Sequence, residues 1–275
     1  MKKRSRILRP VLAISALLAV VSCSTVAFTG RRRILMYSDS QIMSLSDQSY
    51  AAMMDTMKLS SDYVRSAMVT QVGQKLTAAI TLYLTATGET ELLEGLKWDY
   101  KLVRSREVNA FCLPNGKIVF YEGIMPYCSN PDYVAVVMGH EIAHAIARHG
   151  NERMSQRSVL SVAGTVASAV IGLRSGQESQ ELFNLAYNIG GQYGVLLPFS
   201  RKHELEADEI GLVIMALAGY DVDKAPEFWK RLSAGDGASA PAVMSTHPSN
   251  SRRIAAIEKA IPNAKLYAAK LKGQN

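Results

Sequence analysis

The sequence carries two histidines four residues apart, His140 and His144, in an H-E-x-x-H motif. Residues 132–148 read as a helix, and residues four apart on a helix share one face, so both imidazoles can reach one metal ion. Two imidazole nitrogens are a typical start for a Zn²⁺ site. Glu141 lies about 100° around the helix from His140, where it can address water on the metal. The alternative is a surface helix with two histidines, but three of the chain's five histidines fall between 140 and 149.

A third protein ligand is expected, because catalytic zinc usually takes three and keeps one position for water. The best candidates lie downstream in residues 200–208, which open a second helical run to about Ala218. Glu204 and Asp208 are four residues apart and share a face, so one can bind the metal while the other holds a ligating histidine. Glu206 is expected on the opposite side of this helix. The alternative is a solvated, charged first turn that complements the helix dipole.

The two segments together resemble a family of zinc peptidases in which a glutamate is the third ligand. The pattern S-R-x-x-E-x-E-A-D-x-x-G, at Ser200–Gly211, is similar to that of the HtpX, OMA-type and CAAX-prenyl-endopeptidase family. Further similar stretches are N-A-x-x-x-P-x-G-x-I from Asn109, T-H-P-x-x-x-x-R-I up to Ile254, and Gly139 with Arg148-His149 beside the motif. These stretches follow the family's order over a little more than half of the chain.

The resemblance implies an α+β fold, a mostly helical gluzincin-type domain with a small β-sheet beside the H-E-x-x-H helix. It also implies one Zn²⁺ per chain, bound by His140, His144 and Glu204, with Asp208 holding a ligand from behind. Zinc lowers the pKa of a bound water from 15.7 to about 7. Glu141 is then expected to take the proton of this water and pass it to the leaving amine.

Two downstream residues, His247 and Arg253, are implied near the site by the same resemblance. Either can donate to the negative charge that develops on the attacked carbonyl, and His247 can also occupy the open zinc position in a resting state. The alternatives are a turn residue for His247 and an ordinary helix-packing arginine for Arg253. His149 and His203 are expected to be structural or exposed and not ligands.

A small sheet is expected to hold the substrate. Residues 97–104, 108–113 and 117–121 read as strands, and Pro114-Asn115-Gly116 reads as a tight turn. An exposed strand edge can pair with an extended peptide backbone with little sequence preference. The resemblance to the family implies that the strand that pairs with the substrate is the one with Asn109, Ala110 and Phe111. A plain hairpin without a role in substrate binding is the alternative.

The first 22 residues read as a secretory signal peptide. Five basic residues precede an apolar run of eleven residues, Val11–Val21, which is too short for a permanent membrane span. Val20-Val21-Ser22-Cys23 resembles a bacterial lipobox with Cys23 as the lipidated residue, which would anchor the chain firmly. Ser24, in place of aspartate, favours the periplasmic face of the outer membrane. The alternative is an ordinary cleaved signal in which Cys23 is incidental.

The net charge does not indicate a nucleic-acid partner. The formal charge is +7, and about +2 remains without the five basic residues of the signal. No basic stripe with interleaved aromatic residues is present. Of the other cysteines, Cys112 and Cys128 could form a disulfide in an oxidising compartment or stay as two buried thiols.

The predicted organisation is a signal peptide over 1–22, a lipid-anchored tether over 23–38 and one domain over 39–273. Further helices are predicted near 41–57, 62–85, 151–173, 178–197, 223–234 and 252–272. The apolar stretch Val159–Leu173 is interpreted as a buried or partly exposed helix, with a membrane-lying helix or a lid as alternatives. Gly190, Gly191 and Gly194 are interpreted as a flexible lid or plug.

These features predict a zinc metalloendopeptidase of the bacterial cell envelope that hydrolyses extended or misfolded proteins, a role in envelope quality control. The alternative is a self-inhibited chaperone or assembly factor that binds envelope proteins and cuts them rarely, with its metal covered by His247 or by residues 190–194. Processing of prenylated CAAX proteins is not expected, because the sequence has no multi-span region to enclose a prenyl chain. A structural lipoprotein with a vestigial site is the third hypothesis.

Overall fold

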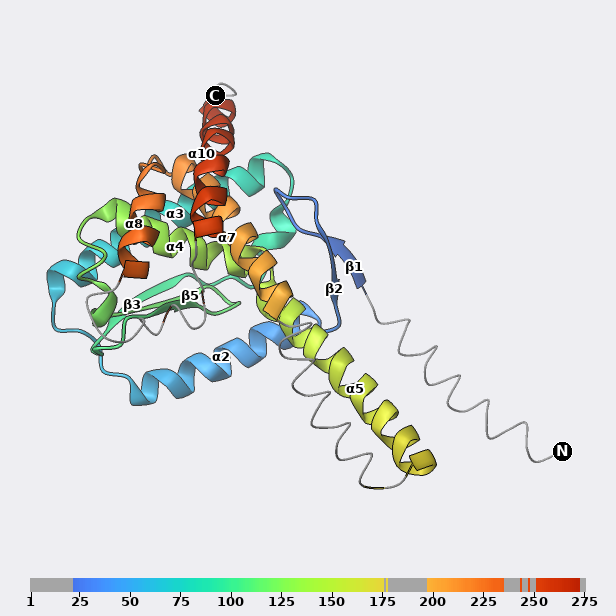
Figure 1. The fold of residues 1–275 in the computed structure, drawn as a ribbon. Helices are drawn as coiled ribbons and strands as arrows, with labels where there is room; N and C mark the ends of the chain where they lie inside the picture. Colours follow the sequence, from blue (N-terminus) through green and yellow to red (C-terminus); the bar gives the residue numbers. More distant parts are fainter. Residues whose placement is uncertain are drawn as a thin grey trace.

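The computed structural model describes residues 22–175, 177, 197–234, 243, 247 and 251–272. In these residues the fold is mostly helical with two small sheets, which confirms the predicted fold class (Figure 1). The elements are, in chain order, β1 (Ser22–Thr25), β2 (Arg32–Leu35), α2 (Asp39–Thr56), α3 (Tyr63–Ala86), η1 (Thr90–Leu93), β3 (Asp99–Val103), β4 (Ala110–Cys112), β5 (Lys117–Tyr121), η2 (Glu122–Ile124), α4 (Pro131–Ile146), α5 (His149–Ser175), α7 (Leu197–Leu217), α8 (Lys224–Ala234) and α10 (Ser251–Lys272).

Helix α4, which carries the H-E-x-x-H motif, lies at the centre of the core. Its side chains are buried from Tyr133 to Ile146. Asn130 caps its first turn by accepting the N–H of Tyr133 at 3.0 Å, and Pro131 takes the first helical position, where no N–H is needed. A helix buried on all sides has a fixed position, so the residues of the motif are held on a rigid element.

Helix α7 packs directly on α4, and two glycines make the close approach possible. A Cβ added to Gly211 would lie 2.9 Å from the backbone nitrogen of His140 and 3.0 Å from the backbone carbon of Gly139. Contacts this short exclude a side chain on Gly211. The backbones therefore meet at the level of the motif, which brings residues 204–208 of α7 opposite the two histidines.

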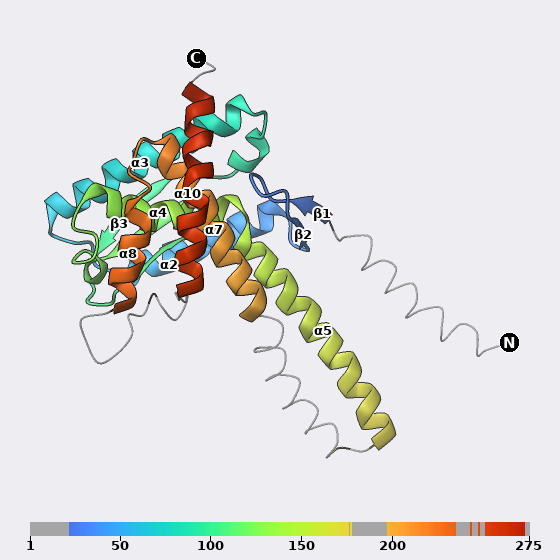
Figure 2. The ribbon, with the colours of Figure 1, turned by 45° about the horizontal axis from the view of Figure 1, so that its top comes forward.

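Helix α4 ends at Ile146, slightly before the predicted end at Arg148. Arg148 adopts a left-handed φ of 52° and turns the chain into α5, while its side chain pairs with Asp39 at 2.8 Å. Both views show α5 projecting away from the rest of the domain (Figures 1 and 2). Because of this sharp turn, His149 at the start of α5 lies close to the motif.

The apolar stretch Val159–Leu173 belongs to this projecting helix. Exposed side chains recur along α5 at Val159, Val162, Val166 and Val170, so the interpretation as a partly exposed helix fits the structure. In the part of the chain that the structure describes, no helix combines the length and the apolar character needed to cross a bilayer. The predicted helix over 178–197 and the glycines at 190, 191 and 194 fall almost wholly outside the described residues.

The three-stranded sheet has the order β3-β5-β4, with β3 parallel and β4 antiparallel to β5. Strand β4 is therefore an edge strand, and it packs beside α4. Gly116, with a φ of +84°, forms the turn between β4 and β5. Helix α2 is held along the sheet by Tyr50, which donates to Asp99 at 2.6 Å.

The first two strands form an antiparallel hairpin in which Cys23 lies opposite Ile34. Val26 at its turn is buried, and Phe28 stacks on Tyr83 of α3 with ring centroids 5.1 Å apart. Much of the predicted tether over 23–38 is thus a structured hairpin on the surface of the domain. Residues 1–21 of the predicted signal lie outside the described residues, and the predicted domain boundaries stay a prediction.

Candidate metal centre

Four buried side chains place one donor atom each within 4.8 Å of one another: His140, His144, Glu204 and His247. The Nε2 atoms of His140 and His144 are 3.0 Å apart, and they lie 3.2 and 3.4 Å from the two carboxyl oxygens of Glu204. Ligands of a tetrahedral zinc at bond lengths near 2.1 Å are separated by roughly 3.3 Å. The spacing of these donors therefore fits Zn²⁺.

The charge of the cluster also fits a divalent cation. Three buried carboxylates, Glu141, Glu204 and Asp208, face one buried guanidinium, that of Arg253. Burial favours the neutral form of Glu204, but the three surrounding imidazoles outweigh it and hold the pKa of this carboxyl well below its usual range. Buried charges are tolerated when they are paired or bind a metal, and a dication would balance the excess.

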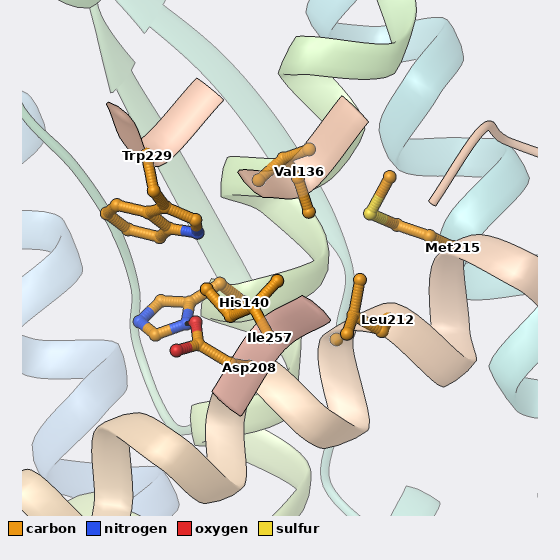
Figure 3. Close-up of a pocket in the computed structure, with 9 residues that line it drawn as sticks. Val136, His140, Asp208, Leu212, Met215, Trp229 and Ile257 are labelled. Atoms are coloured by element: carbon orange, nitrogen blue, oxygen red, sulfur yellow. Dashed lines mark hydrogen bonds and ion pairs between the residues drawn. The ribbon is translucent and has the colours of Figure 1, made fainter. Parts of the chain in front are cut away.

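His140 is oriented from behind by Asp208. Figure 3 shows the carboxylate beside the imidazole, with the indole of Trp229 over the ring, and the distance from Asp208 Oδ1 to His140 Nδ1 is 2.9 Å. Burial lowers the pKa of His140, but Asp208 and Glu204 together raise it to about 9. Without a cation these carboxylates attract a proton to the imidazole, and a metal ion would replace that proton.

Arg253 supports Asp208 and also approaches the ligands. Its Nε and NH2 groups donate to the carboxylate of Asp208 at 2.6 and 2.8 Å, and NH1 lies 3.3 Å from Glu204. The guanidinium stacks over Trp229 at 4.0 Å. Arg253 is predicted to donate to the substrate carbonyl, with a helix-packing role as the alternative, and in the structure it contacts two carboxylates of the site, Asp208 and Glu204.

Glu141 extends toward the edge strand. Its Oε2 accepts the backbone N–H of Cys112 at 3.2 Å, and its Oε1 lies 3.5 Å from Nε2 of His247. The carboxylate thus lies between the metal ligands and β4, where a water or a substrate amide would be. This is the position that a general base requires.

His247 closes the cluster. Its Nδ1 lies 2.9 Å from Glu204 and 3.1 Å from Nε2 of His140, at the fourth corner of the ligand set. The backbone N–H of His247 donates to the carbonyl of Val243 at 2.8 Å. This position is the one expected if His247 occupies the open zinc position, and its roles as a donor to the carbonyl or as a turn residue stay predictions.

The free edge of the sheet is formed by alternate residues of β4. Tyr121 donates to the carbonyl of Asn109 at 3.1 Å, and Leu113 donates to Lys117 at 2.9 Å, so odd-numbered residues direct their backbone groups toward β5. Even-numbered residues, Ala110 and Cys112, direct theirs away from it. Of the predicted substrate-binding residues, Ala110 is at the free edge and Asn109 accepts its N–H at 2.9 Å.

Phe111 has its backbone toward β5, and its ring lies near that of Tyr121, with centroids 6.1 Å apart. Cys112, which the sequence analysis does not assign to substrate binding, is the second edge residue. Cys112 and Cys128 are both free thiols. Burial raises the pKa of both thiols above their usual value.

A cavity of about 200 Å³ opens between α2, the end of β4 and the start of α5. Ile42 and Met43 of α2 line one wall, and Leu113 and His144 line another. One residue of the metal cluster, His144, therefore lines the cavity, and the rest of the lining is mixed, with charged residues beside the apolar ones. Room for one side chain exists directly beside the metal centre.

A second buried cluster behind His144 does not follow from the sequence analysis. His149, expected to be structural or exposed, is fully buried with its Nδ1 2.7 Å from Nδ1 of His144, and burial lowers its pKa to about 4. Glu206 accepts from Nε2 of His149 at 2.9 Å. His203 stacks on His149 with centroids 4.3 Å apart. The pair Arg148-His149 beside the motif is the feature of the sequence that could have indicated this cluster.

The fold and the site together fit a zinc peptidase centre in which two histidines and one glutamate bind the metal. The chain belongs to Peptidase family M48, whose family profile matches residues 89–261. The assignment to this family of zinc peptidases is thereby confirmed, while the lipoprotein branch stays a prediction.

Curated relatives agree with this family. The chain is 42% identical over 176 residues to mitochondrial metalloendopeptidase OMA1 of Schizosaccharomyces pombe, covering 63% of this chain and 50% of the relative. It is 29% identical over 241 residues to human mitochondrial metalloendopeptidase OMA1, covering 86% of this chain and 45% of the relative. It is 30% identical over 159 residues to the beta-barrel assembly-enhancing protease of Escherichia coli, covering 56% and 32%. The chain thus spans half or less of the length of these relatives.

Proposed function

We propose that this protein is a zinc metalloendopeptidase that hydrolyses peptide bonds in extended or misfolded proteins of the bacterial cell envelope. The observation that carries the proposal is the closure of His140, His144 and Glu204 around one point, with Glu141 beside it. The family and the peptidase relatives support the peptidase activity.

The chain's own residues supply the binding and proton-transfer steps. When bound by His140, His144 and Glu204, zinc activates a water and polarises the scissile carbonyl. Glu141 takes a proton from the attacking water and hands it to the leaving amine, which the carboxylate can reach from its place between the ligands and β4. Asp208 keeps the ring of His140 in one orientation throughout.

The substrate would lie along the free edge of β4. A peptide in extended form pairs with the backbone groups of Ala110 and Cys112 and replaces the present partners of their N–H groups, Asn109 and Glu141. Such pairing reads backbone and not sequence, which favours unfolded segments. The cavity beside His144 would take one side chain of the substrate.

The position of the His247 imidazole is the specific observation that favours the second candidate, a self-inhibited chaperone or assembly factor. The imidazole stands at the fourth ligand position, and a catalytic zinc needs that position for water. Because Glu141 is intact, a regulated enzyme fits the site better than a protein that has lost its peptidase activity.

The location in the envelope rests on the sequence of the leader. A basic stretch, an apolar run and the lipobox-like Val20-Val21-Ser22-Cys23 support secretion and lipidation of Cys23. Ser24 supports the periplasmic face of the outer membrane.

The test is metal analysis combined with a protease assay on the wild type and Glu141→Gln. Wild-type protein should contain about one zinc per chain and cleave casein, and Glu141→Gln should keep the zinc but lose the hydrolysis. Glu258→Gln, an exposed carboxylate paired with Lys230, is the matched control and should behave as wild type. Hydrolysis by Glu141→Gln at the wild-type rate would refute the role of the general base.

A further inference from the structure

The two zinc-binding histidines use their second ring nitrogens differently. His140 meets a carboxylate directly, whereas Nδ1 of His144 lies 2.7 Å from Nδ1 of His149. Because Nε2 of His144 points to the metal ligands, its Nδ1 carries the proton and donates it to His149. This fixes the tautomer of His149: Nδ1 accepts a hydrogen bond, and Nε2 carries the proton.

His149 continues the chain of hydrogen bonds to a carboxylate. Its Nε2 donates to Oε2 of Glu206 at 2.9 Å. The ring is fully buried and stacked on His203, so its orientation is fixed by packing. Glu206 thus serves His144 through one intervening imidazole, as Asp208 serves His140 directly.

This series of hydrogen bonds ends on the N-terminal hairpin. Arg31, in the turn between β1 and β2, donates from Nε to Oε2 of Glu206 at 2.9 Å. Its NH1 and NH2 groups donate to the two carboxyl oxygens of Glu152 at 2.8 and 2.7 Å. The hydroxyl of Thr29 in the same turn also donates to Glu206. Paired, largely buried hydrogen bonds of this kind hold a carboxylate in one place.

We propose that Arg31, Glu206 and His149 are positioning residues of the metal centre, so that the docked N-terminal hairpin is part of the zinc site. Arg31 holds Glu206, Glu206 orients His149, and His149 orients His144 toward the metal. By linkage, a hairpin that supports zinc binding is itself held more tightly when zinc is bound.

The competing explanation is that Arg31 only attaches the hairpin. The hairpin offers a matched control for this, because Arg33 is also buried and donates from NH1 to the carbonyl of Ala147 at the end of α4. Arg33 takes no part in the series of hydrogen bonds from His144 to Glu206. Arg32, between them in sequence, is exposed. Substitution of these three neighbouring arginines therefore tests three effects one at a time. Arg31 tests the hydrogen-bond relay from Arg31 through Glu206 and His149 to His144, Arg33 tests the docking of the hairpin, and Arg32 tests the surface charge.

The experiment measures the zinc dissociation constant of the full chain by competition with a chromophoric chelator, and the urea midpoint of unfolding. Arg31→Met should weaken zinc binding about 10- to 100-fold, and Arg31→Lys should recover part of the loss. Arg33→Met should lower the urea midpoint but keep the zinc constant within about threefold of wild type, a change below 1 kcal/mol. Arg32→Met should leave both quantities unchanged.

A double-mutant cycle adds a measurement that a structural role would not affect. His149→Leu should weaken zinc binding as much as Arg31→Met, and the double variant should be no weaker than either single variant, because both break one chain. Wild-type zinc affinity in Arg31→Met, or fully additive losses in the double variant, would overturn the inference.

The inference rests on the proposed zinc site, and the two fail in different ways. If the wild type takes up no zinc, both the proposed function and the relay are wrong. If the wild type binds zinc and Arg31→Met binds it equally well, only the relay is wrong.

Discussion

Val243 donates its backbone N–H to the carbonyl of Val108 at 3.0 Å, just before edge strand β4. The carbonyl of Val243 in turn accepts the N–H of His247 at 2.8 Å. Val108 lies two residues before Ala110, on the same side of the strand as the free backbone groups of Ala110 and Cys112, so the contact lies next to the edge where an extended substrate would pair. His247, at the fourth position of the metal cluster, is therefore connected through Val243 to the strand edge where a substrate would pair.

His247→Ala should raise casein cleavage, because it opens the fourth zinc position. A resting state closed in 90% of molecules lowers apparent activity about tenfold, and an increase of this order is expected in the initial rate. The double variant Glu141→Gln/His247→Ala should stay inactive, which assigns the increase to this site. A decrease in His247→Ala would instead give His247 a role in catalysis.

His140→Ala and Glu204→Ala should each lose zinc. Each removes one of three expected ligands, and a structural or catalytic zinc with only two protein ligands binds weakly. Metal content after gel filtration is the measurement, with Glu258→Gln as the control. Stoichiometric zinc in both variants would contradict the ligand set.

Arg253→Met should destabilise the fold by about 3 kcal/mol or more, because it leaves Asp208 buried without its cation. Lys230→Met removes one partner of an exposed ion pair with Glu258 and should cost less than about 1 kcal/mol. Urea unfolding of both variants checks the difference. Equal losses would mean that burial adds nothing to the pair of Arg253 and Asp208.

Gly211→Ala should destabilise the packing of α7 on α4. The added Cβ would lie 2.9 Å from the nitrogen of His140, and overpacking of this kind costs about 1 to 3 kcal/mol. Gly150→Ala is the matched control, because its Cβ would meet only Pro114 at 3.5 Å and should stabilise α5 slightly. Thermal unfolding should show opposite shifts for the two alanines.

Acid should remove a contribution of Glu152 to stability. Burial raises its pKa, but Arg31 and His203 outweigh this and lower it from 4.5 to about 2. A carboxyl with a depressed folded pKa stabilises the fold above its unfolded pKa, and this stabilisation is lost as pH falls from about 4.5 to about 2. The free energy of unfolding of Glu152→Gln should fall below that of wild type at neutral pH, by at most about 3 kcal/mol. The difference should shrink toward pH 2, whereas a constant difference would contradict the assignment.

The sequence predicts the helices and the ligand-bearing segments well, because their signals are local. The H-E-x-x-H spacing places His140 and His144 on one face, and the predicted start of this helix near Asp132 lies one residue from the observed start at Pro131. The end of α4 was less accurate, because the left-handed φ of Arg148 follows from tertiary contacts. Chain order could not show that Gly139 and Gly211 bring α4 and α7 into contact.

The hairpin and the second cluster could not be predicted, because their stability depends on long-range pairs. Arg31 follows the predicted signal peptide and precedes two more arginines, which is also the pattern of a solvated linker. Its partners, Glu152 and Glu206, lie more than a hundred residues downstream. Such contacts become visible only when the helices that carry them are placed.

The pairing of Cys23 with Ile34 has a consequence for where this protein can work. With the proposed lipid on Cys23, only seven residues lie between this anchor and Arg31, a reach of at most about 29 Å even if extended, and the hairpin folds this length back on itself. The peptidase would therefore be held close to the bilayer without a long flexible linker. Its clients would be chains that emerge from, or stall at, that membrane surface, and proteins diffusing in the bulk compartment would be spared by distance.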